Sequence, residues 1–80
     1  MSELDGLWKV EPLPGVTKRI DGDRGETRFG PLPGVPFKVR GLELDYGLGL
    51  VDRLEPEGDG YRLTATFHGR RLARFRLRRL

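Results

Sequence analysis

Residues 6–22 read GLWKVEPLPGVTKRIDG, and residues 25–41 read GETRFGPLPGVPFKVRG. A shift of nineteen positions aligns the two stretches with seven identities in seventeen residues, among them the whole run Pro12–Val16 against Pro31–Val35. Each copy has the form of a strand, a Pro-Leu-Pro-Gly corner and a second strand. The repeat therefore predicts two similar β-corners, and their origin, by duplication or by independent drift to one tetrapeptide, stays open.

The corners favour extended and turn backbone over helix. Leu13 and Leu32 each precede a proline, whose ring disfavours the helical region for the residue before it. In Pro14-Gly15 and Pro33-Gly34, proline supplies a φ of about −65° and glycine the positive φ of a type II turn. Type II turns twist in the wrong sense for tight two-residue hairpins, so we expect wider bends between strands.

Further along, apolar residues alternate with polar residues or glycine. Over residues 42–50 one parity holds only Leu and Tyr, and the other holds only Glu, Asp and Gly. This period of two is typical of a half-buried strand. We expect one continuous, bent strand over 42–50, and a turn at Gly47–Gly49 that splits it in two is the alternative.

The last two predicted strands constrain each other's register. The inward parity is apolar in both, with Tyr61, Leu63, Ala65 and Phe67 in the first and Ala73, Phe75 and Leu77 in the second. A two-residue turn at His68-Gly69 would pair Leu63 with Arg74 and mix the two faces. We therefore expect a three-residue loop, with Gly69 left-handed and Leu63 opposite Ala73 or Phe75.

Short strands at this spacing, with turn residues between them, predict an all-β fold. We expect a small antiparallel meander of six to eight short strands, rolled into a barrel or half-barrel. Eighty residues form a single domain, 1–80, that contains the internal repeat.

Composition excludes several chemistries. The chain has no cysteine, a single histidine (His68, in a predicted turn) and a single serine near its start, so it offers no disulfide, thiolate metal site or nucleophile triad. Asp21, Asp23 and Glu26 lack the spacing of a calcium loop. We expect no enzyme, no cofactor and no metal. Twelve arginines against three lysines, with no Asn or Gln, are typical of heat-adapted proteins and of GC-rich genomes.

No apolar run approaches the roughly 20 residues that span a bilayer, and the acidic start MSELDGLWK lacks a hydrophobic region. We expect a cytoplasmic protein with no membrane partner.

Charge is distributed unevenly along the chain. Residues 1–60 carry eight basic and twelve acidic side chains, a net charge of −4, whereas residues 61–80 carry seven arginines and no acid. The outward parity of the last strand gathers a predicted basic face, made of Arg70, Arg74, Arg76 and Arg78. This face favours ion pairs within the barrel (to Glu43, Asp45, Glu55 or Glu57), pairing between subunits, or contact with a phosphate backbone.

The start Gly6-Leu7-Trp8 resembles the calycins, the lipocalin and fatty-acid-binding-protein group. Their first strand opens with Gly-x-Trp, and their last strand carries an arginine that packs over the tryptophan; Arg76 or Arg78 is the candidate here. The resemblance implies an up-and-down barrel that binds a small apolar ligand in its mouth. The candidate ligand contacts are the aromatic residues Trp8, Tyr46, Tyr61 and Phe75.

Three hypotheses follow for function. The leading one is a non-enzymatic interaction or structural module that self-associates as a homo-oligomer or binds another protein. The alternative is binding of a small apolar ligand in a lipocalin-like barrel. The third is nucleic-acid binding through the basic face, against which the inward parity of Tyr61, Phe67 and Phe75 counts, because stacking on bases needs exposed aromatic rings.

Overall fold

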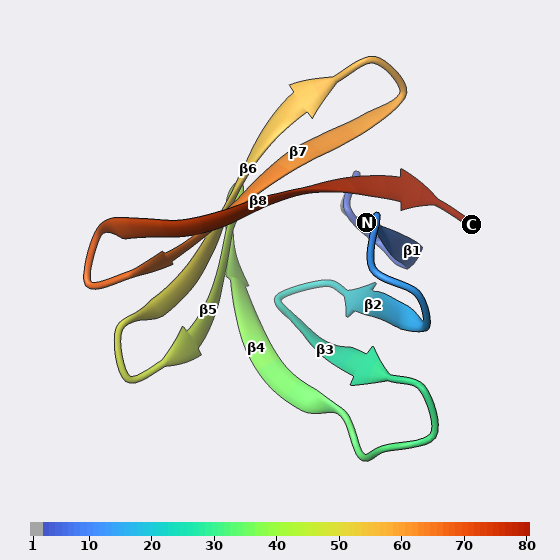
Figure 1. Ribbon diagram of the computed structural model, residues 1–80, viewed down its shortest axis with the longest axis horizontal. Helices are drawn as coiled ribbons and strands as arrows, with labels where there is room; N and C mark the ends of the chain where they lie inside the picture. The colour runs from blue at the N-terminus through green and yellow to red at the C-terminus, as the bar shows by residue number, and fades with distance from the viewer. Residues whose placement is uncertain (1–2) are drawn as a thin grey trace.

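The computed structural model describes residues 3–80, which form eight antiparallel strands closed into one barrel (Figure 1). Each strand pairs with the next in chain order, and the last returns to pair with the first. Residues 3–80 contain no helix. The predicted all-β meander is thus confirmed, in its closed form. The strands are β1 (Gly6–Glu11), β2 (Val16–Asp21), β3 (Arg24–Phe29), β4 (Val35–Arg40), β5 (Glu43–Gly47), β6 (Leu50–Glu57), β7 (Gly60–Phe67) and β8 (Arg70–Arg79).

Successive connections of the meander lie alternately at the two ends of the barrel. We call the end with the β1–β2, β3–β4, β5–β6 and β7–β8 connections the open end, and the other the closed end. Both Pro-Leu-Pro-Gly corners lie at the open end and touch, since the Gly30 N–H donates to the Gly15 carbonyl at 2.8 Å. The turns of β5–β6 and β7–β8 also touch there, through a 2.9 Å hydrogen bond from the His68 N–H to the Gly49 carbonyl.

The two corners share a place in the fold but not a backbone conformation. Gly15 has the positive φ expected of a type II turn, 71°. In the second corner the positive φ belongs to Gly30, at 60°, and not to Gly34. At Gly34 a Cβ would come within 2.4 Å of a Glu26 carboxylate oxygen, so a larger residue there would require the Glu26 side chain to move.

The apolar core fills the closed end. Trp8 is its largest fully buried side chain, and its indole N–H donates to the Leu4 carbonyl at 2.9 Å. The Arg79 guanidinium lies 4.1 Å from the Trp8 ring centre and donates to the Asp5 and Glu3 carbonyls, each at 2.8 Å. The buried apolar residues are Leu4, Trp8, Val10, Ile20, Phe37, Leu44, Leu54, Leu63 and Leu77.

The identity of the arginine over Trp8 was predicted wrongly. Arg76 and Arg78 both point outward, whereas Arg79 has the inward parity of Phe75 and Leu77. The alternation of side chains along a strand therefore decides the partner.

Residues 42–50 form two strands and not the single bent strand that we expected. Gly47 pairs with Leu50 across a two-residue turn, in which Leu48 has a φ of 54° and Gly49 a φ of 85°. Two successive positive φ values give a turn whose twist suits a tight hairpin. The Asp45 carboxylate accepts the Gly47 N–H at 2.8 Å, and the turn leaves Leu48 90 % exposed.

The β7–β8 connection also corrects a prediction. Phe67 pairs with Arg70, so the connection is a two-residue His68-Gly69 turn and not the three-residue loop that we expected. The φ values of the two turn residues are 50° and 83°. The left-handed conformation of Gly69 was predicted correctly. The predicted pairing of Leu63 with Phe75 is nevertheless present. A bulge restores it, because Ala65 pairs with Ala73 while Thr66 pairs with Arg71, leaving Leu72 as the extra residue. Beyond the bulge the faces switch, so Thr66 is buried and Phe67 is 43 % exposed.

Candidate functional site

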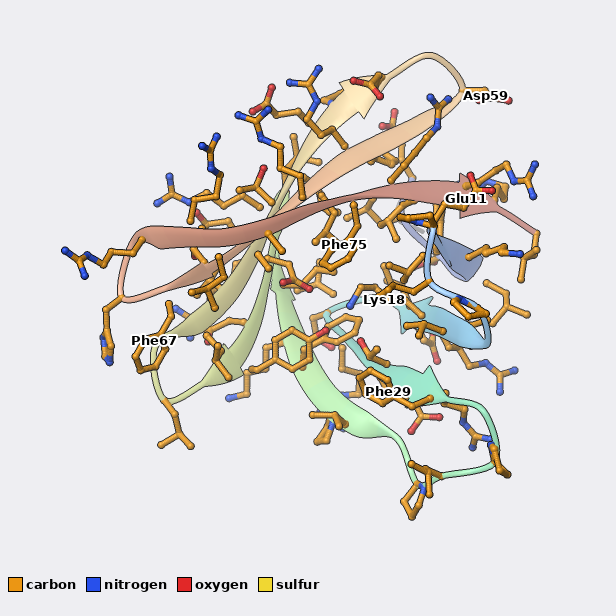
Figure 2. All side chains as sticks on the ribbon, in the orientation of Figure 1. Glu11, Lys18, Phe29, Asp59, Phe67 and Phe75 are labelled. Carbon is orange, nitrogen blue, oxygen red and sulfur yellow. The ribbon has the colours of Figure 1, made fainter. Side chains whose placement is uncertain are left out.

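A cavity of about 270 Å³ enters the barrel from the open end, above the packed core. Its walls are mostly apolar and come from strands all around the barrel; they include Val10, Val16, Phe29, Val35, Ala65 and Phe75. Figure 2 shows Phe75 and Lys18 pointing into the interior, and Phe67 at the outer edge. Two larger hollows, of about 620 and 990 Å³, lie over β1–β5, and half of the residues that line each are charged. The first cavity is the one that holds buried polar groups.

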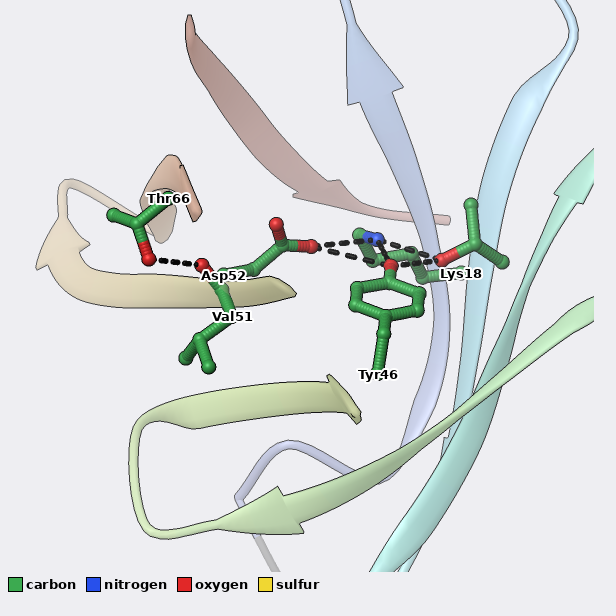
Figure 3. A network of polar contacts seen from close by, with 6 residues as sticks. Lys18, Tyr46, Val51, Asp52 and Thr66 are labelled. Carbon is green, nitrogen blue, oxygen red and sulfur yellow. Dashed lines mark hydrogen bonds and ion pairs between the residues drawn. The ribbon is translucent and has the colours of Figure 1, made fainter. Parts of the chain in front are cut away.

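These groups form a network at the base of the cavity (Figure 3). The Lys18 ammonium on β2 donates to the hydroxyl of Thr27 on β3 at 2.6 Å and to the hydroxyl of Tyr46 on β5 at 2.5 Å. Its third partner is a carboxylate oxygen of Asp52 on β6, 3.1 Å away. The Tyr46 hydroxyl lies 2.6 Å from the Thr27 hydroxyl and 3.2 Å from the same Asp52 oxygen.

Burial decides the electrostatics of the network. The Lys18 side chain is 4 % exposed and that of Asp52 11 %, so each charge has lost most of its water. Burial lowers the pKa of Lys18, and the negative charge of Asp52 opposes part of that effect. Burial raises the pKa of Tyr46, and Asp52 raises it further, which keeps the phenol neutral. The base of the cavity is therefore an ion pair of zero net charge with a neutral phenol beside it.

The structure divides the four predicted ligand contacts between the two ends of the barrel. Tyr46 and Phe75 line the cavity. Trp8 and Tyr61 lie in the closed end, where their rings meet edge-on with centres 5.5 Å apart. Their predicted contact with a ligand stays untested, but they do not line this cavity.

Sequence reasoning missed Lys18 and Asp52, although a signal was present. Lys18 alternates with Val16 and Ile20 on β2, and Asp52 alternates with Leu50 and Leu54 on β6. A charged residue at the inward parity of a predicted strand indicates a buried polar site. The bulge shifts the strand pairing at Ala65 and Thr66 and brings both residues to the cavity. The sequence pattern gives no signal of this shift.

The predicted basic face lies on the outer surface of β8, and none of its four arginines lines the cavity. Arg76 pairs with Glu57 at 3.6 Å and with Asp59 at 3.7 Å, and Arg78 pairs with Glu11 at 3.4 Å. No carboxylate of residues 3–80 forms an ion pair with the other two members, Arg70 and Arg74. The face is thus half neutralised by intramolecular pairs.

Within the described residues, no group of three or more carboxylate or histidine side chains is placed to hold a metal ion. The same part of the chain has no helix long and apolar enough to cross a membrane. No protein-family model, curated protein or solved structure matches the chain.

Proposed function

We propose that the chain binds a small, mainly apolar molecule in the cavity at the open end. The observation that carries this proposal is the apolar hollow of about 270 Å³ over a polar base, in a barrel whose other half is tightly packed. Ligand sites are typically concave and apolar, with a few convergent polar groups. An apolar cavity of roughly 150 Å³ holds benzene, so this cavity suits a molecule of about bicyclic size.

Two features support a calycin-like character for the barrel. The strands run up and down in chain order and close on themselves, as the resemblance at Gly6 and Trp8 implies. An arginine of the last strand, Arg79, packs over the tryptophan of the first strand. We therefore propose a minimal barrel of calycin type, with the closed end sealed by the Trp8–Arg79 contact and the open end free for a ligand.

The test fills the cavity with a side chain. Ala65 lines it and has room beside it, so Ala65→Phe should block ligand entry while leaving the melting temperature unchanged or higher. Thr64→Phe, one residue earlier and on the outer face of β7, is the matched control. Isothermal titration calorimetry with naphthalene derivatives should show binding to the wild type and to Thr64→Phe, and at least about tenfold weaker binding to Ala65→Phe.

A flat titration of the wild type across such a series would count against ligand binding. Equal binding to both phenylalanine variants would place the bound molecule outside this cavity. Calorimetry is preferable to tryptophan fluorescence, because Trp8 lies at the opposite end of the barrel.

Self-association is the second candidate, and one observation favours it. Of ten large apolar side chains exposed in residues 3–80, seven lie at the open end. We call these seven the apolar rim, with exposed fractions from 41 % to 90 %: Phe29, Leu32, Val35, Leu48, Leu50, Phe67 and Leu72. Exposed apolar patches commonly mark interaction sites. An interaction module thus stays a proposal beside ligand binding, and the two uses of the open end are compatible.

Nucleic-acid binding has less support. Tyr61 and Phe75 point into the barrel, and two arginines of the basic face already pair with carboxylates. Of the three aromatic rings expected to face inward, Phe67 alone is exposed, opposite Arg70. Nucleic-acid binding stays a prediction from the charge of β8.

A further inference from the structure

The polar base of the cavity has no hydrogen-bond donor left for a ligand. The Lys18 ammonium uses its three hydrogens on Thr27, Tyr46 and Asp52. With Lys18 bonded in this way, the Tyr46 hydroxyl donates to Asp52 and the Thr27 hydroxyl donates to Tyr46, which satisfies both. The remaining polar residue of the lining, Thr66, donates its hydroxyl hydrogen to the Val51 carbonyl at 2.7 Å.

Acceptors, in contrast, remain available. Both contacts of Asp52 use one oxygen, Oδ2, and Oδ1 takes part in neither. In residues 3–80 every fully buried side-chain oxygen and nitrogen has a hydrogen-bond partner. Oδ1 accepts no such bond, so it is not fully buried and stays accessible. A carboxylate oxygen can accept two hydrogen bonds, so Oδ1 can receive a donor from a molecule in the cavity.

We infer that the cavity selects neutral molecules that carry a hydrogen-bond donor, such as alcohols and phenols, and discriminates against carboxylates of the same shape. This inference rests on the proposed ligand binding and specifies its substrate class. The donor of the ligand bonds Asp52 Oδ1, and its apolar body lies against the walls.

Charge supports the same selection. Lys18 and Asp52 are the two charged residues that line the cavity, and their charges cancel. From the residues that line the cavity, a ligand carboxylate would gain neither a free donor nor a net positive charge in exchange for its lost water, and it would lie near the carboxylate of Asp52. An ammonium ligand would likewise lose its water, and it would lie beside the Lys18 ammonium. The two cations would then share the single negative charge of Asp52.

The experiment compares three probes of one shape: 2-naphthol, naphthalene and 2-naphthoate, each titrated into the wild-type protein at pH 7. A hydrogen bond to an ionised acceptor should make 2-naphthol bind about tenfold more tightly than naphthalene. The cost of desolvating a carboxylate should make 2-naphthoate the weakest ligand, at least about a hundredfold below 2-naphthol.

A variant tests the role of the carboxylate directly. Asp52→Asn removes the one negative charge of the lining and supplies an amide that can donate, so 2-naphthoate should gain affinity and the preference for 2-naphthol should shrink or reverse. Glu55→Gln removes the same charge from the exposed outer face of β6 and should leave the order of the three probes unchanged. The wild-type comparison decides the inference even where Asp52→Asn does not fold.

The outcomes separate this inference from the proposed function. Equal binding of the three probes, or tightest binding of 2-naphthoate, would overturn the inference and leave ligand binding intact. Absence of binding by all three, with Ala65→Phe indistinguishable from wild type, would remove both.

Discussion

Tyr46 links the two charges at the base of the cavity, and its ionisation gives that network a pH dependence. Burial, and then the negative charge on Asp52, raises the pKa of its phenol. In the unfolded chain the tyrosine ionises near pH 10. In the folded chain Tyr46 still keeps its proton at that pH. Above that pH the unfolded state holds fewer protons than the folded state, so the free energy of unfolding falls as pH rises.

Tyr46→Phe removes this contribution. Its free energy of unfolding should fall less steeply with pH than that of the wild type, by about 1 kcal/mol per pH unit above roughly pH 10.5. The lowered pKa of Lys18 adds a slope of the opposite sign, which fades as pH rises past the unfolded lysine pKa of about 10.4. Wild type and Tyr46→Phe both keep Lys18, so the comparison isolates the contribution of the phenol. Urea unfolding at several alkaline pH values measures the slope. Tyr61→Phe, in the closed end and away from Asp52, should keep the wild-type slope, and equal slopes for all three proteins would contradict the prediction.

At the scale of elements, sequence patterns predicted the strands well and the turns poorly. Alternation identified the inward faces of β7 and β8 up to the bulge, because the period of two is set by the pleat. A longer loop and a two-residue turn with a bulge at Leu72 give the same pairing of Leu63 with Phe75, so the pattern could not separate them. For the candidate site, Tyr46 and Phe75 were predicted, whereas the Lys18–Asp52 pair needed the β2–β6 proximity that only closure of the barrel creates.

The β5–β6 turn carries an unfavourable residue that can be tested. Leu48 holds a φ of 54° and is 90 % exposed, so neither its backbone nor its side chain benefits from being leucine. Left-handed backbone costs an ordinary L-residue roughly 1–2 kcal/mol, and Asn tolerates it better. Leu48→Asn should therefore raise the free energy of unfolding by about 1 kcal/mol, measured by urea unfolding. Leu48→Val, with a β-branched side chain, should lower it, and the opposite order of the two variants would refute this account.

At the scale of the whole molecule, apolar surface and charge are both polarised along the barrel. The open end carries the apolar rim together with Arg70, Arg71 and Arg74, for which no carboxylate of residues 3–80 forms an ion pair. The closed end carries the acidic turns, with Asp21 and Asp23 in one and Glu57 and Asp59 in another. For the proposed self-association this distribution suggests two modes: rim against rim, or the basic face of one copy against the acidic end of the next.

Salt distinguishes these modes, because it acts on them in opposite directions. Rim-to-rim contact buries apolar surface but brings arginines of the two copies together, and salt screens that repulsion. We expect this mode, so the dimer fraction in sedimentation at fixed protein concentration should rise between about 0.05 and 0.5 M NaCl.

Leu48→Asn should lower the dimer fraction by removing an apolar contact from the rim, whereas Leu42→Asn, at the closed end, should not. A dimer fraction that falls with salt would instead identify pairing of the basic face with the acidic end. A particle that stays monomeric at high concentration, with a melting temperature independent of concentration, would rule out both modes.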